Sequence, residues 1–74
     1  MSTILQAEKT GFIAEFEDGT GFVIPDDDPD ASLVFFADPD VAKSDWLGQE
    51  DPRPSQRVSF LLDRFGQIIA VKPA

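Results

Sequence analysis

The 74-residue chain contains no cysteine and no histidine. Without cysteine it forms no disulfides or thiolate metal sites, and without histidine it lacks the usual general base and zinc ligand. Ser55 and Ser59 therefore have no histidine partner to activate them as nucleophiles, and no glycine-rich phosphate loop leads into a helix. We expect a protein that is not an enzyme and that carries no cofactor or metal ion.

Long hydrophobic runs are also missing. No segment approaches the roughly 18 apolar residues of a membrane span, and Ile4-Leu5 is too short for the core of a signal peptide. Hydrophobic residues still make up 42% of the chain, with seven phenylalanines, which is too apolar for a disordered acidic tail. We expect one small folded domain in the cytoplasm with no membrane partner, and the sequence does not indicate an oligomeric state.

Positive charge is scarce, with six basic residues against 14 acidic ones and a net charge of −8. Nine of the acidic residues fall between Glu15 and Asp40, where there is no basic residue. Phosphate backbones are bound by Lys and Arg, which release counterions. Tight non-specific binding of nucleic acid would therefore require the remaining basic residues to cluster, above all Lys43, Arg53, Arg57 and Arg64.

Five segments have the composition of β-strands, and none is a convincing helix. The expected strands are Gly11–Phe16, Thr20–Ile24, Leu33–Phe36, Arg57–Leu62 and Gln67–Lys72. Asp18-Gly19 favours a type I′ turn between the first two. Pro25 and the aspartates that follow it end the second strand in an acidic loop.

Two segments fall outside these strands. Residues 1–10 are expected to form a leader that frays or adds to a sheet edge, so the domain proper covers residues 11–74. Residues 42–56 are expected to form a long loop with one anchored aromatic residue, Trp46, after a core contact at Val41.

Five short antiparallel strands with a long connection between the third and fourth suit a small closed barrel, because closure removes exposed sheet edges. This makes the fold all-β. The OB-fold has this layout, and an SH3-like barrel is the alternative that periodicity alone leaves open.

Several motifs resemble those of cold-shock domains over residues 11–73. Residues 19–23, Gly-Thr-Gly-Phe-Val, are similar to the family's Lys-Gly-Phe-Gly-Phe-Ile, and residues 34–41 to its Val-Phe-Val-His-Phe-Ser-Ala-Ile. Near the end, residues 56–60 resemble Gly-Gln-Lys-Val-Ser-Phe and residues 70–73 resemble Asn-Val-Thr-Pro. The resemblance implies a five-stranded OB-fold barrel that binds single-stranded RNA or DNA, with most of the binding positions replaced.

The resemblance also implies where the nucleic-acid site lies. The alternation predicts five inward side chains: Val23, Val34, Phe36, Val58 and Phe60. It then places Phe22 and Phe35 outward on neighbouring strands, where the family stacks bases. We expect a reduced aromatic platform formed by Phe22 and Phe35, with Thr20, Lys43 and Arg57 as further contacts. The competing interpretation is that these phenylalanines belong to the core or its rim.

The acidic residues indicate an alternative function. An array of carboxylates can bind the positively charged surface with which a basic protein otherwise binds phosphates. The chain would then be an interaction module or a nucleic-acid mimic with a basic protein partner. The candidate residues for this surface are Asp26, Asp27, Asp28, Asp30 and Trp46. Trp46 equally suits a role in anchoring its loop to the barrel, and the aspartates suit a solvated loop. A third interpretation is a structural or accessory domain whose acidic residues serve solubility.

Overall fold

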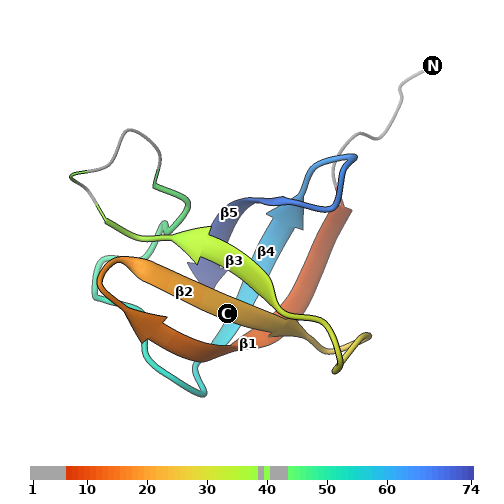
Figure 1. Cartoon of the computed structure of the whole chain (residues 1–74), viewed down its shortest axis with the longest axis horizontal. Coiled ribbons are helices and arrows are strands. Elements are labelled where there is room, and N and C mark those ends of the chain that lie inside the picture. Colours follow the sequence, from red (N-terminus) through yellow and green to blue (C-terminus); the bar gives the residue numbers. More distant parts are fainter. Residues whose placement is uncertain (1–6, 39, 41–43) are drawn as a thin grey trace.

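The structure of the chain is a computed structural model that describes residues 7–38, 40 and 44–74. These residues form one antiparallel sheet in the order β3-β2-β1-β4-β5 (Figure 1). The strands are β1 (Ala7–Glu17), β2 (Thr20–Pro25), β3 (Leu33–Phe36), β4 (Arg57–Leu62) and β5 (Ile68–Pro73). The all-β class, the five antiparallel strands and the long connection between the third and fourth are confirmed. Within the described ranges there is no helix that could span a membrane.

The strand boundaries match the predictions closely except at the start of β1. This strand begins at Ala7 instead of Gly11, because residues 7–12 pair with β4, from Ala7 opposite Leu62 to Phe12 opposite Arg57. The end of the expected leader thus adds to the sheet, and its first six residues lie outside the described part. The turn between β1 and β2 has positive φ at both Asp18 (53°) and Gly19 (81°), which confirms the type I′ geometry.

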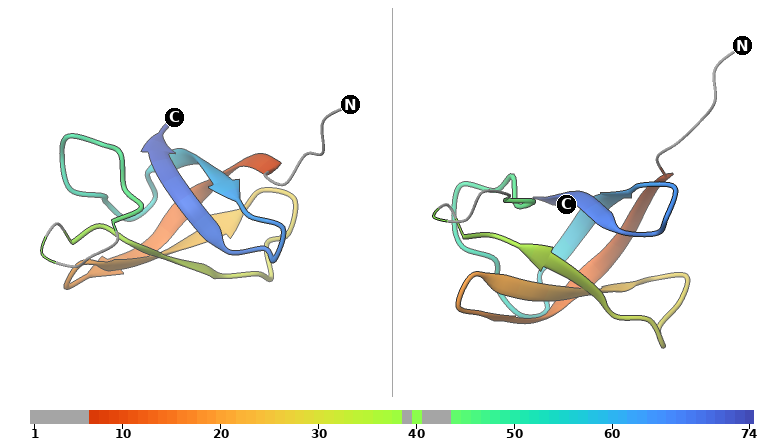
Figure 2. Two further views of the ribbon diagram at one scale, coloured as in Figure 1. Left: turned by 90° about the horizontal axis from the view of Figure 1, so that it is seen from above. Right: turned by 45° about the horizontal axis from the view of Figure 1, so that its top comes forward.

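The sheet curls into a half-barrel, so that its two outermost strands, β3 and β5, approach each other (Figure 2). Part of the long connection lies between them. The backbone N–H groups of Asp45 and Trp46 donate to the carbonyl of Phe36 at 2.7 and 3.2 Å, and Leu47 N–H donates to the carbonyl of Val71 at 2.8 Å. Val71 N–H in turn donates to the carbonyl of Asp45 at 2.8 Å. This segment therefore joins the two free edges of the sheet, which would otherwise offer unpaired backbone groups.

The core lies on the concave side of the curled sheet. Its buried hydrophobic residues are Ile13, Val23, Phe35, Val58, Phe60, Ile68 and Val71. The predicted inward orientation is confirmed for Val23, Val58 and Phe60. It is wrong for the third strand, where Val34 is 45% and Phe36 36% exposed while Phe35 has no exposed surface.

The side chains of β3 point to the opposite faces from those predicted. The local cause is Gly21, which pairs directly with Phe35. A Cβ atom on Gly21 would lie 2.4 Å from both Cε1 and Cζ of Phe35, so the ring occupies the space that a side chain there would fill. The same ring stacks on Phe16 with a centroid distance of 6.3 Å, and the Trp46 ring lies 6.2 Å away on a tilted plane. A shift of one residue in the pairing register would move every side chain of a strand to the other face of the sheet. The contacts of the Phe35 ring determine which face each side chain of β3 takes.

Candidate binding face

A β-bulge in β1 decides which side chains of this strand face outward. The register passes from Ile13 opposite Val23 to Glu15 opposite Phe22, so Ala14 is the extra residue. The bulge is held by the end of the long connection, since Ile13 N–H donates to the carbonyl of Gln56 at 2.9 Å. One inserted residue restores Phe16 to the core side and leaves Glu15 and Glu17 exposed on the other.

These carboxylates share a surface with half-buried side chains of β2, which include Phe22, and with the exposed Val34 and Phe36 of β3. One row across the three strands runs Glu15, Phe22, Val34, and the next runs Glu17, Thr20, Phe36. We call these six residues the outer face. It combines two phenylalanines and a valine with two carboxylates on three adjacent strands.

A hollow of about 500 Å³ opens beside Phe22. Its described lining consists of Ala14, Glu15, Phe16, Glu17, Asp18, Thr20, Phe22 and Pro54. The lining thus includes three acidic residues and two phenylalanines, and among the described residues that form it there is no Lys or Arg. The electrostatic field in this hollow favours a cation.

The predicted nucleic-acid residues are only partly brought together. Phe22 and Thr20 lie on the outer face, and their binding role stays a prediction. The expected outward orientation of Phe35 is wrong, and a ring with no exposed surface cannot stack on a base. Phe36, which the sequence reasoning placed in the core, takes the exposed position instead. Gly21 was the available signal, because a residue without a side chain leaves room for an inward ring on the neighbouring strand.

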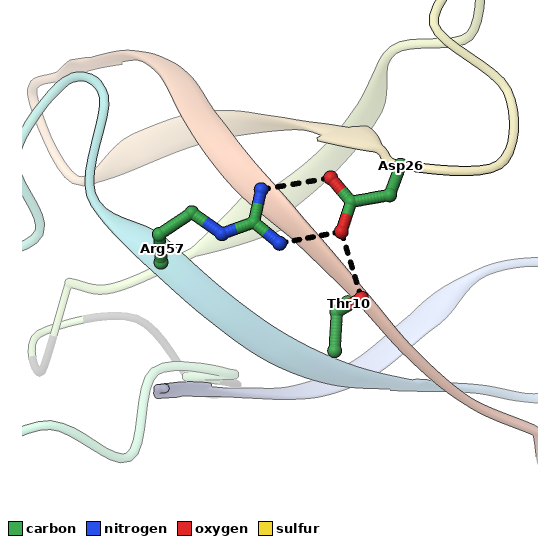
Figure 3. Close-up of polar contacts among 3 residues, drawn as sticks. All are labelled: Thr10, Asp26 and Arg57. Carbon is green, nitrogen blue, oxygen red and sulfur yellow. Dashed lines mark hydrogen bonds and ion pairs between the residues drawn. The ribbon is translucent and has the colours of Figure 1, made fainter.

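Arg57, another predicted contact, is held by Asp26 (Figure 3). Its Nη1 and Nη2 donate to the two carboxylate oxygens of Asp26 at 2.8 and 2.5 Å, and the Thr10 hydroxyl donates to Asp26 Oδ2 at 2.8 Å. The hydrogen bonds from Arg57, and then that from Thr10, lower the pKa of Asp26 from 3.8 to about 2. The hydrogen bond to Asp26 in turn raises the pKa of Arg57. The guanidinium is thus already engaged by a carboxylate, and Lys43 lies outside the described residues.

The depressed pKa of Asp26 makes a testable prediction about pH. A carboxylate whose pKa is lowered on folding stabilises the fold at pH values above its ordinary pKa, and the contribution disappears as the pH falls through the folded value. The stability difference between the natural chain and Asp26→Asn should therefore shrink between about pH 4 and pH 2. Carbon-13 titration of the Asp26 carboxyl group should give a midpoint near 2, and Arg57→Gln should move it upward. A midpoint near 3.8 in the natural chain would contradict the ion pair.

The residues of the predicted acidic partner surface are not gathered in one place. The aspartate loop precedes β3, whereas Trp46 bonds to Phe36 at the other end of that strand (Figure 1). Within the loop, Asp26 bonds to Arg57, and Asp27 forms an ion pair with Lys9 at 2.8 Å, while Asp28 and Asp30 are exposed. Over the described ranges, no group of acidic side chains is arranged to hold a metal ion.

The interpretation of Trp46 as an anchor is confirmed. The half-buried ring packs on the core beside Phe35, and its Nε1 donates to the backbone carbonyl of Glu50 at 2.7 Å. Trp46 therefore holds the long connection against the sheet.

Comparison of the chain with protein-family models, with curated proteins and with solved structures found no match in any of the three.

Proposed function

We propose that this protein is a non-enzymatic binding module that docks a basic segment of another protein on the outer face. The proposal rests on the pairing of accessible apolar side chains with carboxylates: the half-buried Phe22 lies directly opposite Glu15, and the exposed Phe36 lies in the same row as Glu17. Exposed apolar side chains give a partner surface to bury. The carboxylates of Glu15 and Glu17, at the β1 end of these rows, favour Lys and Arg over acidic or phosphate groups.

The charge of the rest of the chain supports a basic partner. The net charge of −8 attracts a cationic segment over several ångströms and raises its association rate at low salt. Two of the described basic residues, Lys9 and Arg57, are engaged in ion pairs with the aspartates of the acidic loop. Their charges therefore oppose an incoming cation less than free side chains would.

The test is a titration of the isotope-labelled protein with a short peptide rich in Lys and Arg, followed by amide chemical shifts. We expect shifts at the outer face and an affinity that falls with salt. Glu15→Gln combined with Glu17→Gln removes two charges from this face, and exposed ion pairs contribute about 0.2–1 kcal/mol each. The double variant should therefore bind about two- to thirtyfold more weakly.

A matched control removes the same number of charges elsewhere. The double variant of Asp28→Asn and Asp30→Asn changes only exposed residues of the acidic loop and should bind the peptide almost as well as the natural chain. Equal weakening by both double variants would mean that binding follows net charge alone, which would overturn the assignment to the outer face.

A second candidate function is weak binding of single-stranded nucleic acid, favoured by the positions of Phe22 and Phe36. They are diagonal neighbours on adjacent strands, close enough for two successive bases to stack on them. Two stacked bases supply about 2–6 kcal/mol, which corresponds at best to a dissociation constant of about tens of micromolar. Outer-face shifts with pyrimidine-rich DNA or RNA, and none with the basic peptide, would favour this function over protein docking.

A further inference from the structure

The pair formed by Glu15 and Phe22 is the most specific feature of the outer face. The two residues lie directly opposite each other on β1 and β2, and facing side chains on adjacent strands have Cβ atoms about 4.5–5.5 Å apart. Both line the hollow, and Glu17 and Asp18 contribute further carboxylates to it. A carboxylate and an aromatic ring are thus offered side by side to a single incoming group.

One common side chain uses both of these neighbours at once. The guanidinium of arginine is planar, donates two parallel N–H bonds to a carboxylate, and stacks on an aromatic face while doing so. The ammonium of lysine is a compact and strongly hydrated charge, so it gains less from a ring and makes no bidentate contact. The hollow, at about 500 Å³, lies within the usual size range of ligand pockets.

The chain itself forms both contacts at exposed positions. Arg57 makes the bidentate bond to Asp26, and the Cζ atom of Arg64 lies 5.0 Å above the centroid of the Phe65 ring. At the outer face the Glu15 carboxylate and the Phe22 ring are adjacent. The bulge at Ala14 and the type I′ turn at Asp18-Gly19 fix the backbone on either side of this pair, so little reordering is needed on binding.

We infer that the hollow beside Phe22 takes an arginine side chain of the docking segment, with the guanidinium stacked on the Phe22 ring and bonded to the Glu15 carboxylate. This inference rests on the proposed function, since it names the residue type through which the basic partner is recognised. Glu17 and Asp18 add to the negative field around the same side chain.

The test compares three peptides that differ at one residue type: a short Gly-Ser peptide with interspersed Arg, the same peptide with Lys at each Arg, and the same peptide with neutral citrulline. Binding is followed by amide chemical shifts of the outer face. We expect the Arg peptide to bind about tenfold more tightly than the Lys peptide, and the citrulline peptide to cause no shifts. Equal binding of the citrulline peptide would overturn the inference, because the carboxylate would then play no part.

Single substitutions test the contributions of the Phe22 ring and of the Glu15 carboxylate separately. Phe22→Leu keeps an apolar side chain but removes the ring, so it should weaken the Arg peptide more than the Lys peptide and abolish the preference for Arg. Glu15→Gln alters an exposed residue and should weaken the Arg peptide more than the Lys peptide. Glu8→Gln, an exposed change on the same strand, is the matched control and should affect neither.

The outcomes distinguish the two proposals. Equal binding of the Arg and Lys peptides at the outer face would overturn the arginine inference and leave the docking of a basic segment intact. Failure of both peptides to shift the outer-face amides would overturn both. If Phe22→Leu loses the dispersed amide spectrum of a folded protein, Glu15→Gln alone decides.

Discussion

Replacing Phe35 by alanine is expected to lower the free energy of unfolding by about 3–5 kcal/mol, the usual cost of removing a buried phenylalanine. The ring has no exposed surface and contacts Phe16 and Trp46. Its removal would leave a cavity against Gly21, which has no side chain to fill it. A small domain has a total stability of about 5–15 kcal/mol, so the variant should be close to unfolding.

The measurement is urea denaturation, with Phe36→Ala as the matched control. The control removes the same side chain from the next residue of the same strand, where the ring is partly exposed on the outer face. It should cost much less, while it should weaken binding at that face. Equal losses of stability in the two variants would contradict the orientation of β3.

Gly21→Ala is expected to destabilise the fold by overpacking, at about 1–3 kcal/mol or more. The new methyl group would lie 2.4 Å from Cε1 and Cζ of Phe35 and 3.2 Å from the backbone carbonyl oxygen of Glu15. The ring has little room to retreat, because Phe16 and Trp46 flank it. A shift of the ring would also disturb the packing of Trp46, which holds the long connection.

A double-mutant cycle with Phe35→Leu identifies this contact as the cause. Leucine lacks the two ring atoms that the new methyl group would meet, so Gly21→Ala should cost less in the Phe35→Leu background than in the natural chain. Both free energies come from the same urea titrations. Strict additivity of the two substitutions would mean that the destabilisation has another origin.

The predictions for Phe35 and Gly21 bear on the binding face, because the side chains of β3 can alternate between the two faces of the sheet in only two ways. When Phe35 occupies the core, Val34 and Phe36 are forced outward beside Phe22. The same geometry that stabilises the core therefore creates the exposed apolar surface. A sequence change that reversed β3 would bury Val34 and Phe36 and leave a different face for a partner.

The positions of the strands could be predicted because their ends carry strong local signals. Asp18-Gly19 adopts the positive φ angles of a type I′ turn, Pro25 is the last residue of β2, and the apolar runs between such signals are of strand length. These preferences act within a few residues. They hold whatever the rest of the chain does.

The pairing of charged side chains could not be predicted in this way. Arg57 and Asp26 are 31 residues apart, and they meet only because β1 lies between β2 and β4 in the sheet. Judged from the composition alone, Arg57 could bind a phosphate group. In the structure it is instead bonded to Asp26 of the acidic loop. Sequence distance carries no information about such contacts.

Local sequence signals were enough to predict the all-β class and the positions of most strands along the chain, and the composition gives the excess of negative charge and the lack of cysteine and histidine. Which side chains form the outer face depends instead on how the strands pack. Alternation along a strand has a period of two residues, so it permits two opposite orientations of equal regularity. The choice between them depended on the space above Gly21 and on the bulge at Ala14. Both arise from contacts between strands and from the end of the long connection, and neither exists until the sheet has formed.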